Sequence, residues 1–107
     1  MHLTERVTFQ SPVPAPDGAG GTVRAWEDLA EYPTVSAAVV HQGYAEGIVA
    51  DRMSATASEL FVIRHRSDLD ERMRILWQGT PYNIRSVRRA RGRRRFLEIV
   101  AERGVAS

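Results

Sequence analysis

The sequence predicts a mainly β protein, built as a small antiparallel β-barrel with one helix and a long hairpin loop rich in proline and glycine. Apolar residues recur with period two in short runs on both sides of the middle of the chain, which is the spacing of half-buried strands. One alanine-rich stretch between these runs has helical spacing instead. Because short turns join the successive strands, we expect an antiparallel sheet that curls on itself, with the helix across one opening.

Three strands are expected ahead of the helix. In the first, Leu3, Val7 and Phe9 share one side of the strand, and polar residues occupy the other. In the third, Val35 and Val39 lie on a common face. The three strands are predicted over residues 3–10, 22–26 and 35–39.

Residues 11–21, between the first two predicted strands, read SPVPAPDGAGG. Prolines at alternate positions cannot donate to a sheet ladder, and the Asp-Gly and Gly-Gly pairs favour turns. We therefore expect a long exposed loop, which is either a mobile connection or an arm that becomes ordered against a neighbouring subunit. As an assembly loop, its candidate residues are Pro12, Pro14, Pro16, Asp17, Gly18, Gly20 and Gly21.

The helix is predicted over residues 43–58, where Tyr44 and Ile48 lie four apart among alanines. A strand over residues 60–66 and an acidic turn over residues 67–72 should follow it. Three short strands are expected to close the chain, over residues 73–77, 82–84 and 96–100. The alternation around the Gly79-Thr80-Pro81 turn predicts a shared inward face, and the expected core residues are Trp26, Trp77, Tyr82 and Ile84.

The composition narrows the class of protein. A chain of 107 residues without cysteine is expected to form one domain, residues 1–107, that has no disulfide, thiol nucleophile or thiolate metal site. No apolar run approaches the roughly 18 residues of a membrane span, and the amino terminus lacks the pattern of an export signal. No catalytic motif or metal-ligand spacing is present, and Asp68, Asp70 and Glu71 fit a hydrated turn. We expect no enzyme, no cofactor, no metal and no membrane association.

Charge is distributed unevenly along the chain. Residues 1–63 hold three arginines and eight acidic residues, net −5, whereas residues 64–107 hold twelve arginines and five acidic residues, net +7. Such asymmetry favours an anionic partner at one end, or subunits that meet basic face to acidic face. All fifteen cations are arginine, which suits bidentate contacts to carboxylates and phosphates, although a GC-rich genome would produce the same bias.

Six arginines gather over residues 88–95, the segment called here the arginine turn. Six guanidinium groups are too costly to bury together, so we expect their side chains to reach outward. They contact either phosphates, with salt-sensitive affinity, or acidic residues of an adjacent subunit, unless the turn is simply solvated. The candidate residues for a DNA channel or a subunit interface are Arg88, Arg89, Arg91, Arg93, Arg94 and Arg95.

These pieces, in this order, resemble the head–tail joining proteins of tailed bacteriophages, also called head-completion, head-closure or stopper proteins. The matching stretches are RVTFQ, DGAGGTVRAWEDLA, FVIRHR, MRILWQGTPYNIRSV and RRRFLEIVAER, together with the valine strand and the alanine-rich segment. They run almost from end to end of the chain. Residues typical of the family, which look structural, are Trp26, Arg64, Gly79, Tyr82 and Ile84. The dense arginine turn and the absence of lysine depart from common members.

The resemblance implies a subunit of a six- or twelve-fold ring in the neck of a virion, from a phage or a gene transfer agent, assembled in the cytoplasm of the bacterial host. The ring would close the DNA-filled head between a portal–adaptor complex above and a tail terminator or tail tube protein below. Double-stranded DNA would pass through its channel. The alternative is a monomeric small-barrel nucleic-acid-binding protein that uses the basic loop over residues 88–95.

Overall fold

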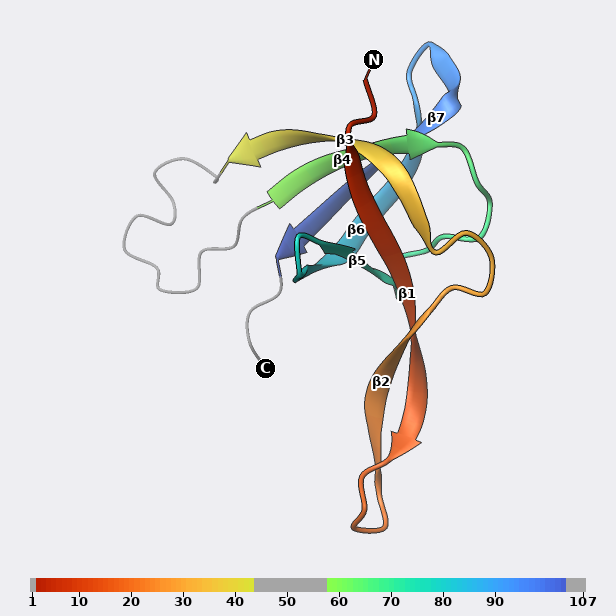
Figure 1. Ribbon diagram of the computed structural model, residues 1–107, viewed down its shortest axis with the longest axis vertical. Helices are drawn as coiled ribbons and strands as arrows, with labels where there is room; N and C mark the ends of the chain where they lie inside the picture. The colour runs from red at the N-terminus through yellow and green to blue at the C-terminus, as the bar shows by residue number, and fades with distance from the viewer. Residues whose placement is uncertain (1, 44–57, 104–107) are drawn as a thin grey trace.

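A computed structural model of the chain describes residues 2–43 and 58–103 (Figure 1). The described residues form seven strands and no helix, so the chain is mainly β, as predicted. No helix long and apolar enough to cross a membrane was found among them. The strands are β1 (Glu5–Pro16), β2 (Thr22–Asp28), β3 (Thr34–Gly43), β4 (Ser58–Arg64), β5 (Arg74–Trp77), β6 (Thr80–Ala90) and β7 (Arg93–Arg103).

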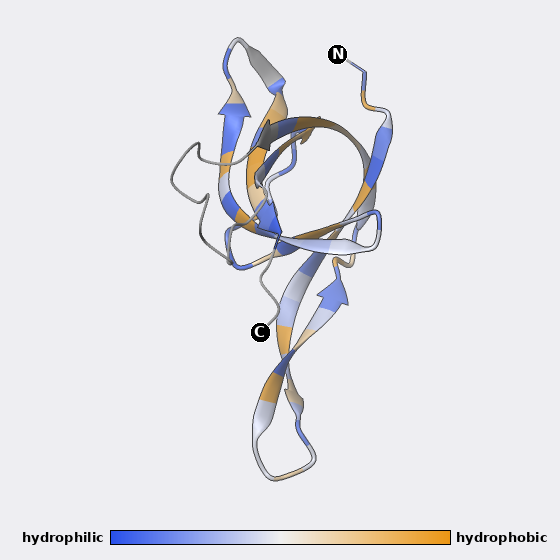
Figure 2. Cartoon of the chain, turned by 90° about the vertical axis from the view of Figure 1, so that its left-hand side faces the viewer, coloured by the Kyte–Doolittle hydropathy of each residue, from blue (hydrophilic) through white to orange (hydrophobic). Residues whose placement is uncertain are grey.

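The strands form one antiparallel sheet in the order β2-β1-β3-β4-β7-β6-β5, and β5 also pairs with β1. The pairings therefore run in a closed cycle of six strands, which Figure 2 shows nearly end-on. A closed cycle covers most of the strand edges through which open sheets otherwise aggregate, although β3 and β6 extend beyond the residues that pair with β1 and β5. Only β2 stands outside the cycle, because it pairs with β1 alone.

The core fills the inside of this closed sheet. Aromatic rings form its centre: Phe61 meets Trp77 and Tyr82 edge-on, with ring centroids 5.8 and 5.5 Å apart. Tyr82 and Ile84 are buried as predicted, whereas Trp77 is half-buried and packs against the core from its margin. The fully buried side chains of largest volume are Phe9, Phe61, Ile63, Ile75, Ile84, Ile99 and Val7.

Strand β1 belongs to both the closed sheet and a projecting hairpin. Its first half pairs with β3 on one side and β5 on the other, and its second half pairs with β2 from Gln10↔Asp28 to Pro16↔Thr22. The predicted loop over residues 11–21 is therefore too long: Ser11 to Pro16 are strand, and only residues 17–21 form the turn. We call this hairpin, residues 11–28, the arm.

The prolines fit into β1 because they face away from β2. Phe9 accepts a main-chain bond from Leu29, and Asp17 donates one to Gly21, so the odd-numbered residues of β1 direct their main-chain groups toward β2. Even-numbered residues direct theirs the other way. The prolines at positions 12, 14 and 16 therefore leave the β1–β2 ladder intact, and their missing N–H groups fall on an outer edge.

The helix predicted over residues 43–58 lies outside the described residues, except that Gly43 ends β3 and Ser58 begins β4. The predicted Gly-Thr-Pro turn is shifted by one residue. Gln78 and Gly79 form a two-residue turn, both with positive φ (53° and 77°), while Thr80 already pairs with Trp77. Two positive φ angles match the twist of a tight hairpin, and glycine adopts one of them without strain.

Removing the central ring should destabilise the protein more than removing the marginal one. Phe61→Ala deletes a fully buried ring and should lower the free energy of unfolding by about 3–5 kcal/mol. Trp77→Ala should cost about 2–3 kcal/mol, because the ring is only half-buried. Denaturant unfolding measures both, with Val40→Ala on the exposed side of β3 as a control. A larger loss for Trp77→Ala than for Phe61→Ala would contradict this description of the core.

Candidate functional site

The two segments singled out from the sequence lie at opposite ends of the molecule. The arm projects from one end of the closed sheet, and the β6–β7 hairpin that carries the arginine turn projects from the other (Figure 1). The view turned by 90° shows the same separation (Figure 2). The longest dimension of the chain is 49 Å. These segments therefore cannot form one site within a single chain.

The tip of the arm is held by Asp17. Its Oδ1 accepts hydrogen bonds from the main-chain N–H groups of Ala19 (2.7 Å) and Gly21 (3.0 Å). These bonds hold the pKa of the Asp17 carboxyl below its usual range. Gly18 and Gly20 have φ of 82° and 90°, a conformation that other residues adopt only under strain. The Asp-Gly and Gly-Gly pairs thus build a defined turn.

The arm exposes apolar surface without having a core. On one face Val13 and Ala15 lie opposite Ala25 and Val23, and Val23 is 50% exposed. The other face carries the three prolines and Trp26. A two-stranded ribbon that projects alone is only marginally stable in water, so a surface of this kind is suited to being covered by another protein.

Trp26 packs at the base of the arm and not in the core, which corrects the prediction. The Arg74 guanidinium lies 4.4 Å from its ring centroid, close enough for a cation–π contact. Arg74 also donates to the Gln10 side chain (2.8 Å), and Gln10 in turn donates to Asp28 (2.8 Å). This chain of contacts ties the arm to β5 and fixes the direction in which it leaves the sheet.

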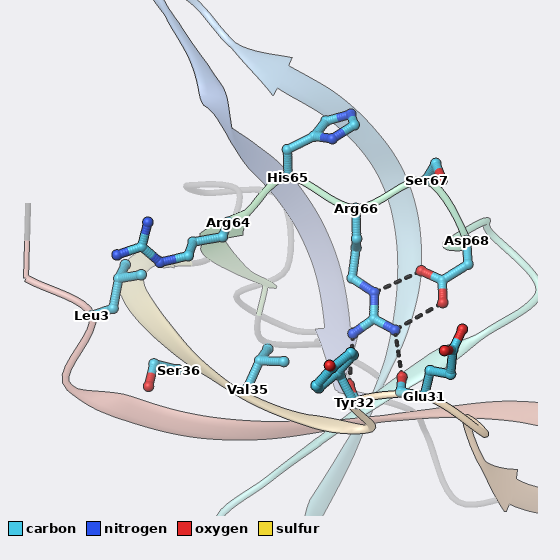
Figure 3. A pocket seen from close by; sticks show the side chains of 10 residues that line it. All are labelled: Leu3, Glu31, Tyr32, Val35, Ser36, Arg64, His65, Arg66, Ser67 and Asp68. Atoms are coloured by element: carbon cyan, nitrogen blue, oxygen red, sulfur yellow. Dashed lines mark hydrogen bonds and ion pairs between the residues drawn. The ribbon is translucent and has the colours of Figure 1, made fainter.

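Arg66 fastens the connection between β2 and β3. Its Nε and one terminal nitrogen donate to the two carboxylate oxygens of Asp68 (2.6 and 2.8 Å). Its terminal nitrogens also donate to the main-chain oxygens of Tyr32 (2.7 Å) and Glu31 (2.9 Å) (Figure 3). The guanidinium lies 5.3 Å from the ring centroid of Phe9. One side chain thereby joins the segment after β4, the segment after β2 and the core.

Arg66 also lines an open hollow of about 620 Å³ (Figure 3). Leu3 and Val35 give it apolar walls, and Arg64 and His65 are exposed beside it. The ion pair with Arg66 holds the pKa of the Asp68 carboxyl below its usual range. Because Arg66 and Asp68 are paired with each other, the hollow contributes to the shape of the surface more than to any chemistry.

The arginine turn is part of a strand pair. Arg88 forms a salt bridge to Glu98 across the β6–β7 ladder (3.0 Å). The charge of one predicted site residue is therefore partly neutralised within the chain. Arg89, Arg91 and Arg95 are exposed, and Gly92 turns the chain with φ of 73°. Arg93 and Arg94 begin β7. The hairpin therefore presents positive charge at its end.

Sequence reasoning missed the Arg66 contacts and the Arg74–Trp26 contact. Two of the Arg66 acceptors are main-chain oxygens 34 and 35 residues away, and no residue type signals them. Trp26 was recognisable as an aromatic anchor, and Arg74 lies in a strand paired with β1. An arginine in an otherwise apolar strand next to a predicted arm was the one available signal for that contact.

Comparison with known proteins identifies relatives over the whole chain. The sequence profile of the family described as phage head completion protein matches residues 1–104. The fold is similar to that of a chain in the structure "Virion of native gene transfer agent (GTA) particle", with a TM-score of 0.73 and 19% identity over 100% of this chain and 99% of that one. It is also similar to protein SF1141 from Shigella flexneri 2a, with a TM-score of 0.67 and 25% identity over 98% and 96% of the two chains. No curated protein matches the chain significantly.

Replacing Arg66 should destabilise the protein more than its position near the surface suggests. Arg66→Ala leaves two carbonyl oxygens and a carboxylate without their donor, and should lower the free energy of unfolding by about 2–3 kcal/mol. Arg72→Ala, which removes an exposed ion pair with Asp70, is the matched control and should cost much less, because exposed ion pairs contribute little to stability. Equal losses in urea unfolding for the two variants would show that Arg66 is not a fastening residue.

The tip of the arm should loosen in acid. Because the pKa of Asp17 is lower in the folded protein than in the unfolded chain, its bonds stabilise the turn at neutral pH and are lost as pH falls through the folded pKa. The protection factors of the Ala19 and Gly21 amides, measured by NMR hydrogen exchange, should fall there relative to that of Val23, whose N–H bonds across the ladder. Asp17→Ala should show the low protection factors already at neutral pH. Protection factors of the two amides, which correct for the slower intrinsic exchange in acid, that keep their neutral-pH values after the Asp17 carboxyl is protonated would contradict the assignment.

Proposed function

Because the chain belongs to the phage head completion protein family and is thus a structural component of a phage or phage-like virion, we propose that it forms a ring between the portal–adaptor complex and the tail. In this position the ring closes the DNA-filled head and provides the docking surface for the tail terminator or tail tube protein. The observation that carries the proposal is the pair of projections at opposite ends of one closed sheet (Figure 1).

A ring needs a rigid body and two different contact surfaces. We read the closed cycle of six strands as the expected small barrel, and it supplies the rigid body. Subunits in a ring larger than a dimer meet through unlike surfaces, one from each neighbour. The arm, which has exposed apolar faces and no core, and the basic hairpin at the opposite end are unlike surfaces in this sense.

We further propose that the arginine turn meets a neighbouring subunit and does not line the DNA channel. The acidic first half and the basic second half of the chain, net −5 and +7, are complementary across a contact between copies. A channel that must release DNA gains nothing from binding phosphates tightly. The alternative of a monomeric nucleic-acid-binding barrel gains no support from the family or from the structure, in which Arg88 is already paired with Glu98.

Electron microscopy of negatively stained samples tests the ring directly. The purified chain is mixed with the portal–adaptor complex of its own particle, and the complex without the chain serves as the control. An added ring density with six- or twelve-fold symmetry below the adaptor is expected. Complexes that remain identical to the control at saturating amounts of folded chain would contradict the proposed function.

Neutralising the arginine turn should affect assembly and leave folding intact. Arg89, Arg91 and Arg95 are exposed, so replacing all three with Gln should change the free energy of unfolding by no more than about 1 kcal/mol. Ring formation should fail, because the acidic surface of the neighbour loses its partner.

A matched control removes the same charge elsewhere. Arg6, Arg72 and Arg103 are exposed away from the turn, and their replacement with Gln should leave ring formation at the wild-type level. Normal rings with altered DNA retention in the first variant would place the turn at the channel. Normal rings with normal DNA retention would show that it is a solvated turn.

A further inference from the structure

We infer that the outer edge of β2 takes up a strand from a second copy of the chain, and that this strand is the far part of β6, residues 85–90. The inference rests on the proposed ring and specifies how neighbouring subunits join. It follows from the main-chain direction of each residue in the arm and from the charges along the two strands.

The two long edges of the arm differ in their capacity to pair. The edge of β1 that faces away from β2 carries Pro12, Pro14 and Pro16, so it offers no N–H donor over these three positions. The outer edge of β2 carries Thr22, Arg24, Trp26 and Asp28, whose N–H and C=O groups point away from β1 because Val23, Ala25 and Glu27 face it. Within the described residues, no strand pairs with this edge.

An edge with free donors and acceptors is a template for another strand, and proline is a recognised means of blocking such pairing. The arm is therefore blocked on one edge and available on the other. This asymmetry limits an added strand to β2 and sets the side on which a neighbour lies. It also prevents arms from stacking into an open sheet through both edges.

The partner strand is indicated by charge and by position. β6 pairs with β5 only through Thr80–Asn83, so in the described part of the chain residues 85–90 have β7 on one side and no strand on the other. Three exposed arginines lie in this part of β6, at positions 85, 88 and 89. Arg85 and Arg88 form salt bridges to Glu102 and Glu98 of β7, so Arg89, which has no salt bridge within the described residues, offers the most available positive charge. β2 carries exposed Glu27 and Asp28, and opposite charges across neighbouring strands are favourable.

The alternatives fit the ring less well. Pairing of β2 with β2 of another copy would use the same surface twice and close a dimer. The second half of β3 also lacks a strand on one side, since β3 meets β1 only through residues 34–37. Its exposed residues there include Val40 and His41, and no arginine is present to oppose the acids of β2. The arm that carries β2 and the far part of β6 lie at opposite ends of the molecule, so pairing of β2 with β6 of another copy connects the copies head to tail.

A single proline substitution tests the edge. Arg24→Pro removes one outward N–H and no bond of the β1–β2 ladder, as the prolines of β1 already do. Arg24→Ala removes the same side chain and keeps the N–H. In the assembly reaction with the portal–adaptor complex, Arg24→Pro should reduce the fraction of complexes bearing a ring at least tenfold relative to Arg24→Ala.

Folding of the arm is checked in the same samples. The amides of Val23 and Ala25, which face β1, should remain protected from hydrogen exchange in Arg24→Pro. Thr22→Pro, at the first residue of β2 where proline is well tolerated, is a second variant that should also reduce ring formation. Rings formed at the wild-type level by either proline variant with a protected arm would overturn the inference and leave the proposed ring standing. Failure of the wild-type chain to form rings would overturn the ring itself, and the inference with it.

Disulfide trapping tests the partner strand, since the chain contains no cysteine. A chain carrying Glu27→Cys on β2 is mixed, under assembly conditions, with a chain carrying Arg85→Cys, Val87→Cys or Arg89→Cys on β6. At least one of these mixtures should give a disulfide-linked heterodimer. Val40→Cys on β3 is the competing partner, and cross-linking to it alone, or to none of the four, would show that β6 is not the strand taken up.

Discussion

The division of β1 between two environments is the constraint on which the rest of the structure depends. Over Val7 and Thr8 the strand is bonded on both sides, to β3 and β5, and closes the sheet. Beyond Gln10 it is bonded only to β2 and leaves the sheet as the arm. One continuous strand therefore transmits the rigidity of the core to a projection that has no core. The position of the arm relative to the closed sheet is a property of the backbone, and the contacts of Arg66 and Arg74 at its base reinforce it.

The same strand explains why proline is compatible with an ordered arm. Alternate placement sets all three prolines on the side away from β2, where a missing N–H costs no hydrogen bond within the chain. In return, the outer edge of β1 cannot accept an unwanted strand. Taken alone, the alternate prolines favour a loop. In the structure they block one edge of the arm and leave the other edge available for pairing.

Features that depend on local sequence patterns were predicted, whereas features that depend on contacts between residues far apart in the sequence were not. A strand was predicted at each of the seven strands of the described residues, in several cases from period-two alternation. Burial of Tyr82 and Ile84 followed from that alternation, because one buried face is enough to set the register. The arm was misjudged because the pairing of Ser11–Pro16 depends on which way Phe9 faces, and that is set by Leu29 and Pro33. The Arg66 contacts could not be predicted for a related reason, because main-chain acceptors carry no sequence signal. The arginine turn was predicted over residues 88–95, but only Arg91 and Gly92 form a turn, because β6 and β7 extend to Ala90 and Arg93. The pairing of Arg88 with Glu98 depends on the register of these two strands.

The most direct test of the proposed strand addition is amide hydrogen exchange along β2 in the free chain and in the proposed ring. The outward amides of Thr22, Arg24, Trp26 and Asp28 should exchange rapidly in the free chain and become protected on assembly. The inward amides of Val23 and Ala25 should be protected in both states. Outward amides that exchange equally fast in the free and assembled forms would contradict strand addition at this edge, and protection that rises equally on both sets would show that assembly only orders the arm.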